Sequence, residues 1–305
     1  MGPRLITRAV IPAAGLGTRL LPATKEQPKE MLPIFAISEN GRCVVKPLVQ
    51  LVFEQLYDVG VREFCFIIGR GKRVIEDHFT QDHDYPERLN GQGKNHLAVD
   101  LSAFYRRLDD TNIVWINQPR PLGFGDAVLR AKKTMGDEEF FVHAGDTCIT
   151  STENEHLQNL SEILETKIPE VVFIVKQMRD VSQRGVVQGR ELSLGLYEVD
   201  AVVEKPDYPV SNLAIEPVYI FRPSIFDALE ETSPGKGGET QLTDAIQMII
   251  ESGKLVIAWR LCDNHLRFDV GDPESYWEAL RSSYAASSKV GEIIAEAPHA
   301  SPRHH

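Results

Sequence analysis

The sequence has few cysteines and no long apolar run, and each shortage excludes a class of protein. Its four cysteines are widely spaced and form no CxxC pair: Cys43, Cys65, Cys148 and Cys262. That spacing argues against a disulfide framework or a zinc site and favours free thiols in a reducing compartment. No apolar run approaches the roughly 20 residues that span a bilayer, and Met1-Gly-Pro-Arg does not open a signal peptide. We therefore expect a cytoplasmic protein that does not enter a membrane.

Positive charge is also scarce. The formal net charge is −11, from 33 Lys and Arg against 44 Asp and Glu. A nucleic-acid polymer needs a basic face, so it is excluded as a partner, whereas a small anionic ligand needs only a local cluster of cations. With 305 residues, 42% of them hydrophobic and 25% charged, the chain has the composition of a globular protein with a large core.

Apolar runs alternate with helically periodic segments through the first half of the chain. The pattern predicts strands over 5–11, 64–68, 112–116 and 139–144, and helices over 44–59, 69–80 and 126–135. Residues 81–111 are polar and read as an excursion with a helix over 97–108. The alternation predicts an α/β fold with a Rossmann-like, mainly parallel sheet sandwiched by helices.

The pattern of apolar residues changes in the second half of the chain. After a helix over 155–165 and a strand over 171–175, short strand-like runs at 185–187, 201–204 and 214–221 alternate with turns. They predict a smaller, partly antiparallel subdomain packed on the first. A helix over 241–251, a strand over 256–261 and a closing helix over 273–286 follow. We expect one domain over 1–290, with parts at 1–170 and 171–265, and a disordered tail over 291–305.

The loop after the first predicted strand contains several small and positively charged residues that could bind a ligand. The strand runs into Ala13-Ala14-Gly15-Leu16-Gly17-Thr18-Arg19, and Lys25 and Lys29 follow. Small residues let the backbone approach a ligand closely, and free N–H groups beside an arginine suit a polyphosphate. The third glycine of a dinucleotide fingerprint is replaced by Leu20, and the Walker pattern is absent. A nicotinamide dehydrogenase is therefore disfavoured.

The spacing G-x-G-T-R-L-x-P-x-T-x-x-x-P-K resembles the signature of the sugar-phosphate nucleotidyltransferase family. The segment PATKEQPKEMLPI is most similar to the bacterial members that act on UTP and glucose 1-phosphate. Similar segments continue at 46–47, 203–206, 211–215, 238–245 and 268–271, so the resemblance spans about 5–285. It implies Mg²⁺-dependent, in-line transfer of a nucleotidyl group from UTP to glucose 1-phosphate, without a covalent enzyme intermediate. It also implies a homo-oligomer, a dimer or tetramer, without an added β-helix domain.

The resemblance assigns residues to each part of such a site. For the nucleotide it implies Ala13, Ala14, Gly15, Gly17, Gln118, Gly123 and Asp146. The implied catalytic cations are Arg19, Lys29 and Lys205, and Mg²⁺ would be held by Asp146 and Asp269. For the sugar it implies Gly185, Glu204, Lys205 and Asn212. A Gln amide both donates and accepts, as the O4 and N3–H edge of uracil requires.

Three places in the sequence depart from the family pattern. Leu122 and Asp126 stand where Lys and His are common, and Glu216-Pro217-Val218-Tyr219 stands where the family has V-G-R-Y. These departures leave open which base and sugar are preferred, so a thymidylyltransferase using dTTP and a non-catalytic sugar-nucleotide-binding protein remain alternatives.

Two polar residues have two readings each from the sequence, and a third has one. Lys25 fits a phosphate contact or a solvated surface side chain equally well, and Glu239 fits a sugar contact or a helix cap. Asp272, followed by Pro273, is predicted to cap the closing helix.

Overall fold

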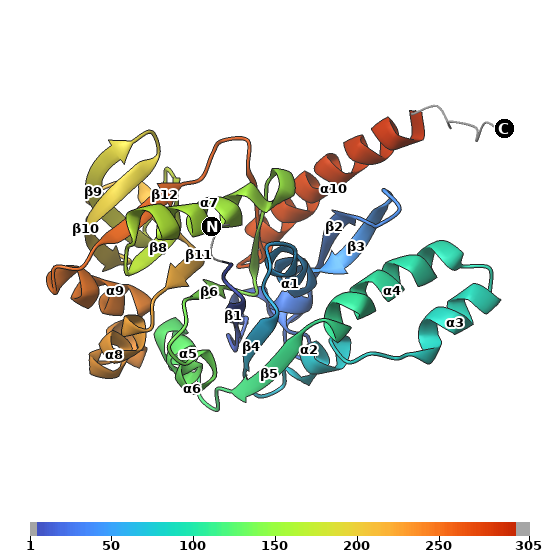
Figure 1. The fold of residues 1–305 in the computed structure, drawn as a ribbon, viewed down its shortest axis with the longest axis horizontal. Helices are drawn as coiled ribbons and strands as arrows, with labels where there is room; N and C mark the ends of the chain where they lie inside the picture. The colour runs from blue at the N-terminus through green and yellow to red at the C-terminus, as the bar shows by residue number, and fades with distance from the viewer. Residues whose placement is uncertain (1–4, 297–305) are drawn as a thin grey trace.

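The computed structural model describes residues 5–296, with side chains except at 236 and 289–296. Nine strands form one sheet (Figure 1), in the order β5-β4-β1-β6-β11-β8-β12-β10-β9. In that order they are Asn112–Asn117, Glu63–Ile68, Arg8–Ala13, Phe140–His143, Leu213–Phe221, Val171–Gln177, Val256–Arg260, Leu196–Glu204 and Gly185–Ser193.

The direction of the strands changes partway across this sheet. Strands β5, β4, β1 and β6 are all parallel, and β8 is parallel to β12. Strand β11 runs antiparallel to both β6 and β8, and β10 runs antiparallel to β12 and β9. The predicted α/β fold is confirmed, and its sheet is mixed, with the antiparallel pairings in the second half of the chain. Those strands continue the same sheet and do not form a separate one.

Successive residues of β1 enter two different cores, because a strand alternates its side chains between the faces of a sheet. Ala9 and Ile11 join one core and Val10 the other. The first core is covered by α1 (Leu48–Asp58), α2 (Arg73–His78), α4 (Asn95–Asp109) and α7 (Glu155–Lys167). The second is covered by α5 (Phe124–Arg130), α6 (Lys132–Met135), α8 (Ser224–Glu231) and α9 (Leu242–Glu251), which gather at the lower left in Figure 1.

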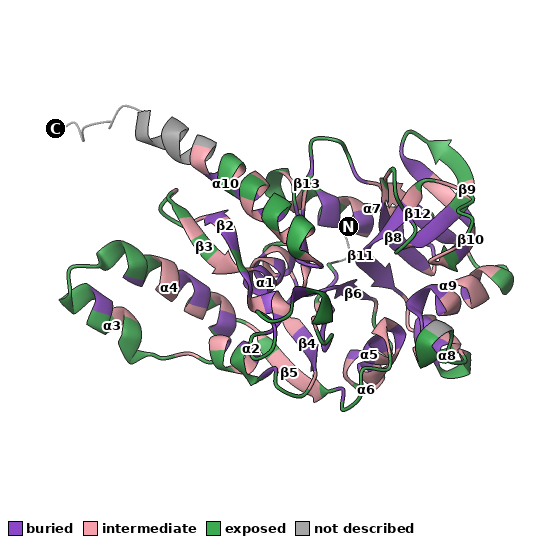
Figure 2. Cartoon of the chain, turned by 180° about the vertical axis from the view of Figure 1, so that it is seen from behind, coloured by how far each residue is buried: buried purple, intermediate pink, exposed green. Residues whose placement is uncertain are grey.

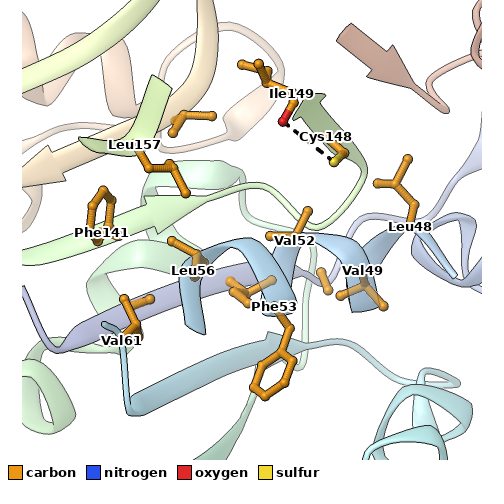
Figure 3. Close-up of a cluster of buried hydrophobic side chains, with 14 of the residues drawn as sticks. Leu48, Val49, Val52, Phe53, Leu56, Val61, Phe141, Cys148, Ile149 and Leu157 are labelled. Carbon is orange, nitrogen blue, oxygen red and sulfur yellow. Dashed lines mark hydrogen bonds between the residues drawn. The ribbon is translucent and has the colours of Figure 1, made fainter. Parts of the chain in front are cut away.

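Helix α1 shows how the first core forms. Its apolar residues recur at helical spacing, so Leu48, Val52 and Leu56 lie on one face with Phe53 beside them. Figure 3 shows these side chains on the helix, together with Phe141 of β6, which belongs to the same core. All five are fully buried or nearly so. Strands β1 and β6 pair in parallel beside this core, so their carboxyl ends lie at the same edge of the sheet.

Several predicted boundaries were wrong. The helix expected over 44–59 begins at Leu48, because Cys43–Pro47 is β3, which pairs with β2 (Pro33–Ile37) in a hairpin. The excursion contains α3 (Asp84–Gly91) before α4. Two further strands, β7 (Thr147–Thr150) and β13 (Leu266–Asp269), form a ladder that no alternation pattern indicated. Four- and five-residue strands carry too little periodicity to be recognised alone.

The closing helix α10 (Pro273–Glu296) begins as predicted and ends later. Asp272 caps it: its Oδ1 accepts from Ser275 N at 2.8 Å, and its own N–H donates to Ser275 Oγ at 3.0 Å. The helix runs ten residues past 286, so 291–296 of the expected disordered tail are helical. Residues 297–305 of that tail lie outside the described residues. Helix α10 packs against β2 and β13, and its described side chains range from buried to exposed (Figure 2). No helix within 5–296 is long and apolar enough to cross a membrane.

Candidate active site

Two adjoining cavities open at the carboxyl ends of β1 and β6, the edge where parallel sheets place their ligands. The first, of about 360 Å³, is lined by Pro12, Ala14, Gly15, Leu16, Gly17, Thr18, Lys29, Glu30, Gln118, Pro121, Gly123, Phe124, Ala127, Ala144, Asp146 and Glu239. The second, of about 470 Å³, is lined by Arg19, Phe124, Ala144, Asp146, Thr147, Met178, Asp180, Gln183, Arg184, Pro217, Arg267, Asp269 and Asp272. Phe124, Ala144 and Asp146 belong to both, so the cavities form one cleft.

The loop after β1 is held in shape by its own residues. Gly17 has φ +65°, and Thr24 Oγ1 donates to its carbonyl at 2.7 Å. A Cβ added at Gly15 would lie 3.7 Å from Lys29 Cε, so the lysine stem runs against the loop. Ala13 is buried behind the cavity wall and does not line it. Short 3-10 turns, Thr18–Leu20 and Lys29–Met31, follow instead of the helix that a dinucleotide fingerprint needs.

Lys29 and Asp146 meet at the wall between the cavities. Lys29 Nζ donates to Asp146 Oδ2. The charge of Asp146 raises the pKa of Lys29, against the opposing effect of its burial. Burial on its own would raise the pKa of Asp146, but Lys29 and then Arg267 hold it below the ordinary value. Both groups are therefore ionised at neutral pH, although both are largely buried.

A second buried ion pair supports the first. Lys72 Nζ donates to Glu30 Oε2 at 2.7 Å, and their side chains are 8% and 2% exposed. Burial, the largest effect, raises the pKa of Glu30, and the charge of Lys72 opposes it. The sequence interpretation missed this pair. Its only local signal is that Glu30 directly follows Lys29 within the motif.

Asp146 and Asp269 approach each other across the short β7–β13 ladder. Asp269 pairs with Thr147 in the register, and Val270 N donates to the carbonyl of Asp146 at 3.2 Å. Asp269 Oδ2 accepts from Arg267 at 2.9 Å and lies 3.4 Å from Arg184. Two residues separated by 123 positions thus line the same cavity.

Arg19 reaches the same cavity from the loop after β1. Its Nη1 lies 3.9 Å from Asp272 Oδ2, and its side chain is 65% exposed. The guanidinium is therefore free to turn toward a ligand.

The donor set suits a hard divalent cation. Two carboxylates face one cavity, and each keeps acceptor sites after bonding to a lysine or an arginine. Within the described residues no group of three or more His, Cys, Asp or Glu side chains could hold a metal ion. Mg²⁺ is bound in proteins by one or two carboxylates, with water and phosphate oxygens completing the shell. Asp146 and Asp269 fit that requirement.

Gln118 lies at the far end of the first cavity and is tightly engaged. Its Nε2 donates to the carbonyl of Gly123 at 3.1 Å and to Asp126 Oδ2 at 2.6 Å. Arg130 Nε and Nη2 contact the two oxygens of Asp126 at 2.8 Å and 3.2 Å. Gly123 has φ +102°, and a Cβ there would lie 2.7 Å from the carbonyl oxygen of Thr240. The sequence did not predict this clamp, because the loop between Gln118 and Asp126 has no periodic pattern that would bring their side chains together.

The residues expected to bind the sugar lie beside the second cavity and do not line it. Gly185 faces Glu204 across the β9–β10 ladder, and a Cβ on Gly185 would lie 3.3 Å from Glu204 Oε2. Thr243 Oγ1 donates to that oxygen at 3.2 Å, and Lys205 Nζ lies 3.3 Å from Glu204 Oε1. Asn212 is exposed, and only its backbone reaches the cavity wall, through Met178 N at 3.0 Å.

Glu216, one of the departures noted in the sequence, anchors the second cavity from behind. Its side chain is fully buried, and Oε2 accepts from Arg267 Nε at 2.5 Å. Burial would lower the pKa of Arg267, but Glu216 and then Asp269 raise it. Within the described residues Oε1 of Glu216 has no hydrogen-bond partner. Arg267 thus links a buried carboxylate to the one exposed in the cavity.

Two open readings from the sequence can be compared with the structure. Lys25 is 77% exposed, pairs with Glu26 at 3.7 Å and lines neither cavity. Glu239 lines the first cavity. The reading of Glu239 as a helix cap was wrong, since α9 begins at Leu242 without a side-chain cap.

Comparisons with known proteins identify the family of the chain. The family model described as "Nucleotidyl transferase" matches residues 8–285. A UTP–glucose-1-phosphate uridylyltransferase of Pseudomonas aeruginosa is 37% identical, over 94% of this chain and 99% of that protein. One of Streptococcus pyogenes is 40% identical, over 88% and 85%. The crystal structure of a UDP-glucose pyrophosphorylase complexed with UDP-glucose superposes with a TM-score of 0.78 at 32% identity, over 92% of this chain and 99% of that one.

Proposed function

The chain belongs to the nucleotidyl transferase family, and we propose that it transfers a uridylyl group from UTP to glucose 1-phosphate, giving UDP-glucose and pyrophosphate. One observation carries the proposal: two cavities meet at a wall where Lys29 and Asp146 form an ion pair. A nucleotide in the first and a sugar phosphate in the second would bring their phosphates together at that wall.

The proposed reaction is a single displacement. An oxygen of the phosphate of glucose 1-phosphate bonds to the α-phosphorus of UTP, while the bond from that phosphorus to the bridging oxygen breaks. The electron pair leaves with pyrophosphate. A phosphate monoester is already nucleophilic, so no side chain needs to attack or remove a proton. Catalysis then consists of positioning and of stabilising charge that develops on the phosphate oxygens.

The cations of the cleft are proposed to stabilise that charge. Lys29 lies at the shared wall, where it can exchange its bond to Asp146 for phosphate oxygens. Arg19 is 65% exposed at the second cavity, which leaves its guanidinium free for bidentate contact with a phosphate. Lys205 is proposed to pair with the sugar phosphate from the cavity's margin, together with Glu204, Gly185 and Asn212 for the hexose.

We propose that the divalent ion is Mg²⁺, held by Asp146 and Asp269. When bound, Mg²⁺ would neutralise phosphate charge near the breaking bond. Asp146→Asn should shift the Mg²⁺ concentration for half-maximal activity upward by about tenfold, because a carbonyl oxygen replaces a charged ligand. Asp227→Asn, on exposed α8, is the matched control. An unchanged Mg²⁺ titration of the Asp146 variant would remove this residue from the metal site.

Pyrophosphate release tests the function directly. The purified chain is incubated with Mg²⁺, one of UTP, dTTP, CTP or ATP, and glucose 1-phosphate or galactose 1-phosphate. We expect the fastest release from UTP with glucose 1-phosphate and a product that is UDP-glucose. Fastest release from dTTP would replace the proposal by a thymidylyltransferase. No release from any pair would favour a non-catalytic sugar-nucleotide-binding protein.

We further propose that the enzyme acts in the cytoplasm as a dimer or tetramer. All four cysteines are free, as suits a reducing compartment. Helix α10 exposes Trp277 and Tyr284, at 65% and 54%. Light scattering of the purified chain reports its mass, and a monomer across micromolar concentrations would contradict this expectation.

A further inference from the structure

The clamp on Gln118 bears on which base the first cavity accepts. Gln118 lines that cavity and is only 5% exposed. The neighbours of its amide nitrogen are the carbonyl oxygen of Gly123 and the carboxylate of Asp126. Both neighbours accept hydrogen bonds and neither donates, so the nitrogen must face them.

Asp126 itself is held in one orientation. Arg130, one helical turn along α5, contacts both of its carboxylate oxygens, at 2.8 Å and 3.2 Å. A carboxylate bonded to a guanidinium is an acceptor only and cannot exchange roles with the amide. The two N–H groups of Gln118 are therefore both used inside the protein. Its carbonyl oxygen is the polar atom that remains for a ligand.

We infer that Asp126 is a positioning residue for base selection: it locks the Gln118 amide so that the carbonyl oxygen, an acceptor, meets the base. Uracil and thymine carry a donor at N3–H, whereas cytosine carries an unprotonated acceptor at N3. An acceptor locked against N3 binds the first two bases and opposes the third. The inference rests on the proposed function only in placing the base in the first cavity.

The test measures equilibrium binding of UTP, dTTP and CTP, each with Mg²⁺, to the full chain by calorimetry. In Asp126→Asn the new amide can donate to Gln118, and only the Gly123 carbonyl then still holds the Gln118 nitrogen, so the Gln118 amide can turn over and offer N–H to cytosine. We expect the preference for UTP over CTP to fall by at least about tenfold. The preference for UTP over dTTP should stay within about twofold, because both bases carry N3–H.

The matched control is Asp227→Asn, the same substitution on exposed α8, which should change neither ratio. A UTP-to-CTP ratio that does not move, or two ratios that fall together, would overturn the inference and leave Asp126 a merely structural residue. If Asp126→Asn does not fold, Arg130→Met loosens the same clamp from a half-buried position. It should lower the UTP-to-CTP preference by about threefold, and an unchanged preference would likewise overturn the inference.

Failure of the proposed function looks different. A chain that binds UTP over CTP, loses that preference in Asp126→Asn, and yet releases no pyrophosphate would contradict catalysis and support base selection. A chain that makes UDP-glucose, and whose base preference does not change in Asp126→Asn, would support catalysis and contradict the role of Asp126 in base selection.

Discussion

The first cavity is walled mostly by backbone and small side chains, whereas the second is walled by ionised side chains. Pro12, Ala14, Gly15 and Gly17 follow one another along a single loop of the first. The second holds Arg19, Arg184 and Arg267 opposite Asp146, Asp180, Asp269 and Asp272. One half of the cleft is thus shaped by local conformation, and the other by pairs of opposite charge.

The two cavities also differ in how far apart in the sequence their contacting residues lie. Thr24 fastens Gly17 from seven residues away. In the second cavity Arg267 pairs with Glu216 across 51 residues, and Arg184 approaches Asp269 across 85. A motif in one segment can therefore specify the first half, while the second exists only in the folded chain. Three variants test this comparison, and a fourth tests a buried histidine outside both cavities.

Arg267→Met should have the largest effect of the four variants, and the effect should be a loss of stability. It leaves the fully buried Glu216 without its cation, and breaking a buried pair costs about 3 to 5 kcal/mol. Urea unfolding measures the loss. The double variant Arg267→Met with Glu216→Leu removes the stranded charge as well and should recover most of the loss. A single variant as stable as the wild type would show that the second cavity does not depend on this pair.

Lys29→Ala should reduce turnover at the wall that both cavities share. Loss of one preorganised donor costs about 3 to 4 kcal/mol of barrier, a rate factor of roughly 10² to 10³. Steady-state pyrophosphate release measures it, and circular dichroism checks that the fold persists. Lys25→Ala is the control, because Lys25 is 77% exposed and outside both cavities. Near-normal turnover in the Lys29 variant would contradict the assignment of Lys29 as a catalytic residue.

Gly123→Ala should disturb the first cavity through backbone contact. Its φ is +102°, and a Cβ would lie 2.7 Å from Thr240 O, so we expect a loss of about 2 to 3 kcal/mol and a higher KM for UTP. Gly237→Ala is the control: its φ of +81° is equally unfavourable, but nothing lies within 4 Å of the added Cβ. Equal losses in both variants would mean that close approach at Gly123 is unimportant.

His156→Asn should have the smallest effect and concerns neither cavity. Burial first, and then His143 and His265, lower the pKa of His156 from 6.5 to about 3. As pH falls below about 6.5, His156 binds a proton in the unfolded chain but not in the folded chain, so the free energy of unfolding declines. Between about pH 7 and pH 5 the wild type should lose about 1 to 2 kcal/mol more than the variant. Parallel pH profiles from urea unfolding would contradict this.

The sequence singled out more residues of the first cavity than of the second. It identified the loop of Gly15 and Gly17 with Arg19 and Lys29, which the structure gathers with Asp146 and Asp269 around one cleft. It assigned Gly185 and Glu204 to the sugar, and the structure pairs them across the β9–β10 ladder, beside the second cavity. It missed Glu30, Lys72, Arg184 and Arg267, because an isolated charged residue has no pattern that separates it from a solvated surface.

What the sequence determined by itself was the order of the longer strands and helices and the chemistry of one loop. Periodicity and short motifs are local, so they can be read without knowing the fold. Only the tertiary structure decided that Gly123 abuts Thr240, that Asp126 clamps Gln118, and that Glu216 lies beneath Arg267. None of these contacts follows from a local periodic pattern, because each depends on how loops, strands and helices pack together. Such contacts form only when the chain closes around its two cores.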